Sequence, residues 1–246
     1  MGRVLNFGHR GASHDAPANT LAAFELAADC GADGVELDVR LTADRQPVVI
    51  HDSTVDATTD GSGRVAEMSL AEIKALDAGR SFDPRFAGER IPTLSEVFEA
   101  LGQRLLFNVE LKGTSARPDG LEAIVAEAIS RHNLASRVIV SSFNPLRLRR
   151  FRRLLPQVAI GYLHMPGQPL HKRRGWLLWG LPHEADHPEQ SLVTPRYMAW
   201  ARSRRLRVNT WVVNDVQRMA DLRDMGVDMI ITDRPDVLRA VLHGER

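Results

Sequence analysis

The chain has 246 residues, enough for one large domain or two small ones, and its 32 basic and 31 acidic residues leave a net charge of +1. This balance gives no electrostatic reason to expect a nucleic acid as a partner. One cysteine, Cys30, excludes an internal disulfide and a multi-thiolate zinc site, and the absence of a leader or a long apolar segment predicts a cytoplasmic globular protein.

Short β-rich apolar runs alternate with amphipathic segments along the chain. Strands are predicted, in chain order, at "RVLNF", "DGVELDV", "PVVI", "LLFNVEL", "RVIVSSF", "VAIGYL", near 185–187, "RVNTWVV" and "DMIITD". Helices are predicted at 19–30, 70–76, 94–101, 121–132, after Pro145, and at 195–203, 216–225 and 235–242.

This alternation indicates a parallel sheet. Eight β-α units in about 250 residues are typical of a TIM (β/α)8 barrel. A doubly wound open sheet is the competing topology, but no glycine-rich dinucleotide loop follows the first strand. Residues 53–91 interrupt the alternation, so we expect residues 1–246 to form a single barrel domain in which 53–91 is a small insertion.

Polar side chains occur in predicted strands that should be almost wholly apolar, because parallel strands are covered on both faces. Glu36 and Asp38 are two residues apart and therefore point to the same side of their strand. Glu110 holds a similar place in "FNVELK", while His9 and His51 end two further strands. All five fall near strand C-termini, which is the face where barrel enzymes build their sites.

Three carboxylates that converge at this face would repel each other strongly in a low-dielectric setting. A divalent cation removes the repulsion, and hard oxygen donors suit Mg²⁺ or Ca²⁺ rather than a soft metal. We therefore predict a metal site formed by Glu36, Asp38 and Glu110. For one isolated carboxylate, an ion pair with a neighbouring cation would be the simpler interpretation.

Histidine is the side chain best suited to exchange protons near neutral pH. Two histidines beside a cation site, His9 and His51, therefore predict a general acid–base pair, and Asp52 is placed to orient His51 or to join the metal's outer shell. Arg10 and Lys112 would add positive charge for an anion, and phosphate fits best because guanidinium and ammonium groups clamp its oxygens.

These residues resemble one family, the glycerophosphodiester phosphodiesterases. The similar pieces run from His9 to Asp236 and agree in order and spacing. They are "HRGASHDAPANT", "GADGVELDVRLTADRQPVVIHD", "TTDGSG", "IPTLSEV", "FNVELK", "SSFN", "TWVVND" and "ITDRP".

The resemblance implies a TIM barrel with a small insertion after the second histidine, over residues 53–91. It implies metal-dependent cleavage of a glycerophosphodiester to glycerol 3-phosphate and an alcohol. The implied roles are metal binding by Glu36, Asp38 and Glu110, acid–base catalysis by His9 and His51, phosphate binding by Arg10 and Lys112, and lining of the alcohol pocket by Trp211 and Phe143.

Two positions depart from the family pattern. Ala18 stands where the family usually has glutamate, and Ala57 stands where it usually has arginine. We hypothesise that these form an ion pair in relatives, because losing both partners of a buried pair can be neutral whereas losing one is costly. The departures affect the prediction of the substrate more than the prediction of the activity.

Two alternatives stay open. Tryptophans beside basic residues suit a membrane interface, so Trp176 and Trp179 suggest a lysophospholipase D-like enzyme that acts on lysophospholipids at a membrane surface. A non-catalytic phosphoester-binding barrel would lack a histidine or a metal carboxylate, and none is missing. The basic run Arg147–Arg153 is interpreted as a solvated helix face rather than a nucleic-acid site, because it has no interleaved aromatic residues.

Overall fold

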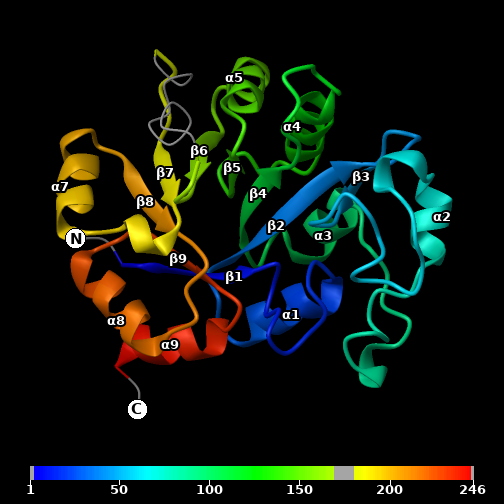
Figure 1. The fold of residues 1–246 in the computed structure, drawn as a ribbon, viewed down its shortest axis with the longest axis horizontal. Helices are drawn as coiled ribbons and strands as arrows, with labels where there is room; N and C mark the ends of the chain where they lie inside the picture. Colours follow the sequence, from blue (N-terminus) through cyan, green and yellow to red (C-terminus); the bar gives the residue numbers. More distant parts are fainter. Residues whose placement is uncertain (1–2, 169–179, 245–246) are drawn as a thin grey trace.

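A computed structural model describes residues 3–168 and 180–244, so Trp176 and Trp179 lie outside the described residues. Its central feature is a closed barrel of eight parallel strands surrounded by helices (Figure 1). Strand β1 pairs with β2 on one side and with β9 on the other, which closes the sheet. The predicted TIM barrel is confirmed, and the open sheet is wrong.

The observed elements follow the predicted order. The barrel strands are β1 Leu5–His9, β2 Gly34–Leu41, β4 Leu106–Leu111, β5 Val138–Ser142, β6 Ala159–His164, β7 Ala185–Pro188, β8 Arg207–Thr210 and β9 Met229–Thr232. The α-helices are α1 Leu21–Asp29, α2 Leu70–Ala75, α3 Leu94–Leu101, α4 Leu121–Arg131, α5 Pro145–Leu154, α7 Pro195–Ser203, α8 Val216–Met225 and α9 Pro235–His243.

Local sequence signals account for several helix starts. The Thr93 hydroxyl accepts a bond from the Glu96 amide while the Glu96 carboxylate accepts one from the Thr93 amide, so a capping box starts α3. Helices α5, α7 and α9 begin at prolines, whose fixed φ suits a first helical position. These signals explain why the predicted and observed starts agree at α3, α7 and α9.

Two apolar layers hold the barrel together. Leu37, Val109 and other outward-facing strand residues pack against the helices, whereas Phe7 and Ile231 belong to a smaller cluster on the inward side. Full burial of one such side chain contributes about 1.5–3 kcal/mol. The inward row of β2 is different because it carries Glu36 and Asp38.

The "PVVI" segment does not join the barrel. Residues Pro47–Val49 form β3, which pairs antiparallel with the far end of β2, with Val39 opposite Val49. The prediction that His51 ends a strand is therefore wrong in detail, because β3 ends at Val49 and His51 follows two residues later. Since β2 runs past the barrel rim, a hairpin partner carries His51 back to the mouth of the barrel.

Residues 53–91 lie outside the ring of strands, beside β3 and α3 (Figure 1). They contain the 3₁₀ helices Val65–Glu67 and Pro84–Phe86 as well as α2. Their small apolar cluster also includes Val48 and Ile50, on the segment that carries His51. This shared cluster supports our proposal that 53–91 is an insertion packed onto a single domain.

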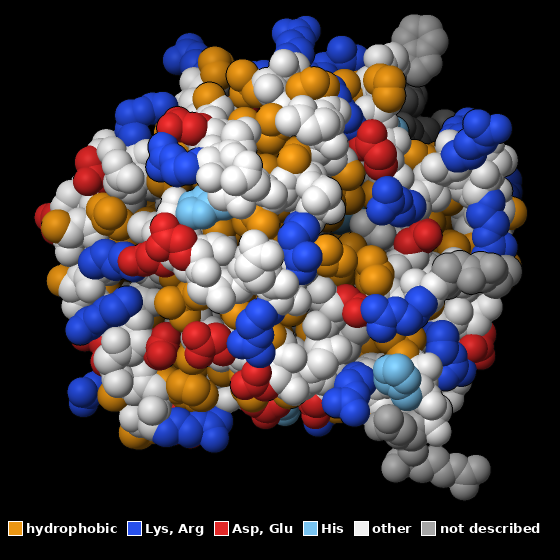
Figure 2. Space-filling view, turned by 180° about the vertical axis from the view of Figure 1, so that it is seen from behind, with side chains coloured by type: hydrophobic (Ala, Val, Ile, Leu, Met, Phe, Trp, Pro, Cys, Tyr) orange, Lys and Arg blue, Asp and Glu red, His pale blue; other side chains and the backbone are white. Residues whose placement is uncertain are grey.

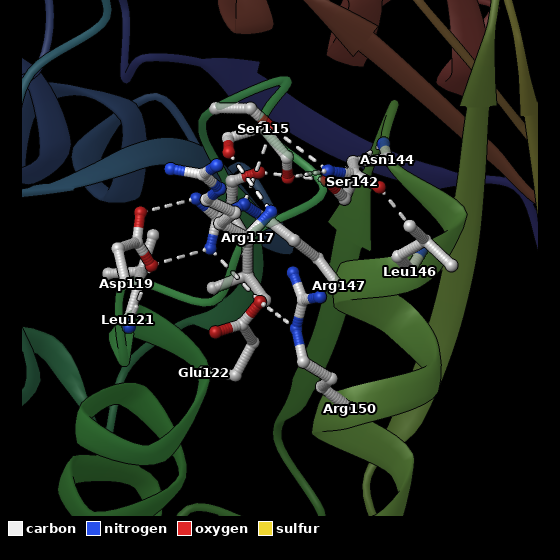
Figure 3. Close-up of polar contacts among 12 residues, drawn as sticks. Ser115, Arg117, Asp119, Leu121, Glu122, Ser142, Asn144, Leu146, Arg147 and Arg150 are labelled. Atoms are coloured by element: carbon white, nitrogen blue, oxygen red, sulfur yellow. Dashed lines mark hydrogen bonds and ion pairs between the residues drawn. The ribbon is translucent and has the colours of Figure 1, made fainter.

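The arginines of α5 do not form the predicted solvated face. Arg147 is 1 % exposed and contacts both Asp119 and Glu122, while Arg150 donates to Glu122 (Figure 3). The Arg147 guanidinium also donates to the Gly113 carbonyl at 3.3 Å. The basic run therefore anchors the loop between β4 and α4, because carboxylates of that loop and of α4 neutralise it.

Replacing Arg147 with methionine is expected to lower the free energy of unfolding by about 3–5 kcal/mol, the usual cost of removing one partner of a buried ion pair. Glu122, itself 3 % exposed, would keep only its bond with Arg150. Urea denaturation measures the loss. Arg153→Met, on the exposed side of the same helix, is the control. An equal loss of stability in both variants would contradict the anchoring role of the Arg147 ion pairs.

The outer surface carries charge of both signs. On the face seen in Figure 2, Lys and Arg side chains are interspersed with Asp and Glu, and neither sign dominates a large area. Within residues 3–168 and 180–244, no helix combines the length and the apolar character that crossing a bilayer requires.

Candidate active site

Three carboxylates meet at one place in the barrel mouth. Glu36 and Asp38 come from β2, and Glu110 lies on β4 directly opposite Asp38. One oxygen from each lies within 4.8 Å of the other two, and all three side chains are buried. The structure thus brings together the three residues that the sequence predicted as metal ligands.

Cations and an amide surround Asp38 in particular. The Lys112 ammonium donates to Asp38 Oδ1 and to Glu110 Oε1, each at 2.9 Å. Arg10 Nε lies 3.3 Å from Asp38 Oδ2, which also accepts a bond from Asn19 Nδ2 at 2.9 Å. Burial alone would raise the pKa of Asp38, but Lys112 and Arg10 outweigh it and hold the pKa at about 2.

The pKa values of Glu36 and Glu110 are shifted in the opposite direction. Burial raises the pKa of Glu110 to about 7, although Lys112 opposes the shift. Burial, followed by repulsion from Asp38 and Glu110, raises the pKa of Glu36 well above its usual value. Ionisation of all three carboxyls is therefore disfavoured when only Lys112 and Arg10 are beside them, so an additional hard cation would favour the ionised form and be bound by it. The donor set therefore fits Mg²⁺ or Ca²⁺.

Each predicted catalytic histidine is held by a carboxylate through its Nδ1 atom. His9 Nδ1 lies 2.6 Å from Asp233 Oδ1, and His51 Nδ1 lies 2.7 Å from Asp52 Oδ1. A carboxylate at Nδ1 favours the tautomer with the proton on that atom, which leaves Nε2 free to accept a proton. His9 Nε2 is 4.0 Å from Glu36 Oε2, so this nitrogen faces the metal ligands.

The pKa shifts differ between the His9–Asp233 pair and the His51–Asp52 pair. Burial lowers the pKa of His51, while Asp38 and the bond with Asp52 act in the opposite direction. Burial disfavours the Asp233 carboxylate, yet the hydrogen bond from His9 brings the pKa of Asp233 to about 2. Asp233 is therefore ionised at neutral pH and can stabilise a protonated ring on His9.

The first loop needs its glycine. Arg10 adopts φ +56° and donates its amide to the Glu36 carbonyl at 2.9 Å. Gly11 follows at φ +90°, and a Cβ there would lie 2.5 Å from the Ala23 carbonyl carbon. Only glycine therefore allows the sharp turn that places the Arg10 guanidinium beside Asp38.

Trp211 and Phe143 form an aromatic pair. Their ring centroids are 5.5 Å apart with an interplanar angle of 88°, an edge-to-face contact. Trp211 Nε1 donates to the His187 carbonyl at 2.8 Å, which fixes the indole. Both side chains are half-buried, as a wall of an alcohol pocket requires, and that role stays a prediction.

Sequence reasoning missed two members of the site. The sequence predicts Asn19 or Thr20 near the cap of α1, and Thr20 is the cap, but the contact of the Asn19 amide with Asp38, made at φ +62°, was not foreseen. Asp233 received no role, yet it binds His9, Ser13 and Asn214. Its place directly after the last barrel strand was a signal that could have found it.

The departures at Ala18 and Ala57 can be located. Ala18 lines a cavity of about 30 Å³ together with Arg10, His51 and Thr58, while Ala57 is exposed. The first loop and the insertion therefore meet beside Ala18. The ion pair suggested for relatives stays a hypothesis.

Comparison with known proteins gives a consistent result. The model of the family described as "Glycerophosphoryl diester phosphodiesterase family" matches residues 9–237. A glycerophosphodiester phosphodiesterase of Caldanaerobacter subterraneus subsp. tengcongensis is 42 % identical over 239 residues, which cover 96 % of each chain.

Solved structures agree in fold over almost the whole chain. An Oleispira antarctica phosphodiesterase in complex with the product sn-glycerol-3-phosphate is 32 % identical with a TM-score of 0.86, covering 99 % of this chain and 97 % of its own. A glycerophosphodiester phosphodiesterase from Agrobacterium tumefaciens is 30 % identical with a TM-score of 0.83, covering 98 % of this chain and 100 % of its own.

Proposed function

Because the chain belongs to the glycerophosphoryl diester phosphodiesterase family, we propose that it hydrolyses glycerophosphodiesters to glycerol 3-phosphate and an alcohol. One observation carries the proposal. Three buried carboxylates meet beside two imidazoles, each of which has Nδ1 held by a carboxylate. The product bound to the Oleispira antarctica structure supports the same substrate class.

Glu36, Asp38 and Glu110 would hold a divalent cation, Mg²⁺ or Ca²⁺. When bound, it would neutralise charge on the phosphate oxygens and lower the pKa of the attacking hydroxyl. Lys112 and Arg10 already lie beside these carboxylates, so a phosphate in the mouth would meet two protein cations as well.

Proton transfer would be carried by the two histidines. In one assignment, His9 Nε2 removes the proton from the glycerol hydroxyl next to the phosphoester, and that oxygen attacks phosphorus. The bond from phosphorus to the alcohol breaks as His51 protonates the leaving oxygen. Water then opens the cyclic phosphate with the proton transfers reversed. The reverse assignment of the first acid and base uses the same atoms.

The alcohol released would leave past Trp211 and Phe143. Their paired rings present an apolar wall without a charge of their own, which suits a range of alcohols rather than one headgroup. No contact within the described part of the chain favours a lysophospholipid over a soluble glycerophosphodiester. We therefore expect the soluble substrates to be preferred.

A hydrolysis assay tests this proposal. Purified protein is expected to release glycerol 3-phosphate from glycerophosphocholine and glycerophosphoethanolamine faster than from a lysophospholipid. EDTA should abolish the reaction, and added Mg²⁺ or Ca²⁺ should restore it.

The outcomes separate the parts of the proposal. Full activity in EDTA would contradict the metal assignment. A clear preference for the lysophospholipid would support the alternative substrate. The absence of hydrolysis from all three compounds, with either metal added to folded protein, would overturn the proposed function.

A further inference from the structure

Arg40 contacts the backbone of a proposed catalytic histidine. Its Nε and Nη2 atoms donate to the His51 carbonyl at 2.8 and 2.6 Å. Arg40 lies in β2 two residues after Asp38, so it continues the row of Glu36 and Asp38 toward the end of the strand. The guanidinium fork thus bridges the metal-binding strand and the segment that carries His51.

The His51 segment depends on this contact because the β ladder stops before it. The Ile50 amide donates to the Asp38 carbonyl at 2.9 Å, whereas the carbonyl of the next residue accepts from the Arg40 side chain. His51 therefore lies beyond the regular pairing of β2 with β3. A planar fork that makes two bonds to one carbonyl limits the rotation of that peptide.

Arg40 also lies where three parts of the mouth meet. It lines a cavity of about 120 Å³ with Ser53 and Val65 of the insertion and with Lys112 and Gly113, which directly follow β4. Ser53, two residues after His51, borders this cavity, so on that side the loop faces open space rather than a packed neighbour. The charge-assisted bonds supply the missing constraint.

We propose that Arg40 is a positioning residue that holds the His51 peptide, and through it the imidazole, in line for proton transfer. The inference rests on the proposed function, because it requires His51 to exchange a proton with the substrate. Arg40 itself touches no reacting atom in this scheme.

The first test compares Arg40→Met with the parent in the metal-loaded full-length protein, with glycerophosphocholine as substrate. kcat is expected to fall roughly 10- to 100-fold, the cost of about 1 Å of misplacement. KM should change little, because the proton moves only in the transition state. Arg40→Lys, with one ammonium toward the carbonyl, should recover part of kcat.

Arg90→Met is the matched control. Arg90 also donates to a backbone carbonyl, that of Ala75 at 2.8 Å, but does so within the insertion. Its kcat should equal that of the parent. An equal loss of kcat in Arg90→Met and Arg40→Met would overturn the specific role of Arg40.

A double-mutant cycle separates positioning from general damage. Arg40→Met should cost little additional activity in a His51→Ala background, since residues that act through one group are non-additive. Both variants are also assayed on the p-nitrophenyl ester of glycerol 3-phosphate, which has a better leaving group. The change in the kcat of Arg40→Met on this ester should have the same direction as the change for His51→Ala. Additive losses would assign Arg40 a structural role and overturn the inference.

Failure of the inference is distinguishable from failure of the proposed function. A parent protein that hydrolyses none of the three compounds would overturn the proposed function. A parent that is active, together with an equally active His51→Ala, would contradict the acid–base role of His51 and the inference with it. An inactive His51→Ala with a fully active Arg40→Met would contradict only the role of Arg40. Should Arg40→Met fail to fold, as judged by its melting curve, the cycle is run with Arg40→Lys and decides in the same way.

Discussion

Replacing either His9 or His51 with alanine is expected to lower kcat for glycerophosphocholine by roughly 10²- to 10⁴-fold, the usual contribution of a general acid or base. Both imidazoles are oriented by a carboxylate at Nδ1, and His9 Nε2 faces the Glu36 carboxylate at 4.0 Å. Steady-state kinetics at saturating metal measure the loss.

His243→Ala is the control for this experiment, because His243 is an exposed residue in the last turn of α9. Its kcat should match that of the parent. If replacing one of the two histidines lowers kcat by less than about tenfold, the acid–base role of that histidine is contradicted, because the loss is below the range expected for a general acid or base.

Replacing Glu36 with glutamine is expected to weaken binding of Mg²⁺ or Ca²⁺ by more than about 100-fold, since even outer-shell partners of a metal ligand cost roughly 10- to 100-fold. The metal-free variant should melt at an equal or higher temperature than the metal-free parent. The reason is that burial, Asp38 and Glu110 all disfavour the Glu36 carboxylate, and the amide removes that charge.

Isothermal titration gives the affinity, and melting curves with and without metal give the stability. The parent should gain melting temperature on adding metal, because a ligand that binds only the folded state stabilises it, and Glu36→Gln should lose this gain. Glu67→Gln, at an exposed ion pair with Arg64, should behave like the parent. Unchanged affinity in Glu36→Gln would contradict the metal site.

The two histidines and the three carboxylates are placed by the same physical requirement. Carboxylates and imidazoles are costly to bury, so a barrel that buries them together must offset the cost by mutual contacts. Lys112 bridges two of the carboxylates, and Asp233 and Asp52 support the two rings. The same contacts that make burial tolerable also fix the geometry that the proposed catalysis requires.

Much of the barrel was predictable because the relevant signals are local. Apolar runs, caps and prolines mark the elements, and helices α3, α7 and α8 were predicted to the residue. The carboxylate set was predictable for a related reason. Alternation along a strand places Glu36 and Asp38 on one side, and parallel pairing brings strand ends to one edge.

Other parts depended on contacts between distant segments. The "PVVI" strand was predicted correctly, but a short apolar run does not reveal that its partner is antiparallel or that it ends two residues before His51. The interpretation of the α5 arginines failed because the sequence does not show that Asp119 and Glu122 lie against Arg147. Both outcomes depend on which distant segment packs against the one in question, and no local pattern shows this.

The order of elements, the closed-barrel fold class and the types of side chain at the mouth could be predicted, since they follow from periodicity and residue chemistry. The partner of each polar group depends on tertiary contacts. Asp233 meets His9 across 224 positions of sequence, and Arg40 reaches the His51 carbonyl across a hairpin. Such pairings depend on how the chain closes on itself, and closure of the barrel brings together groups that no local pattern connects.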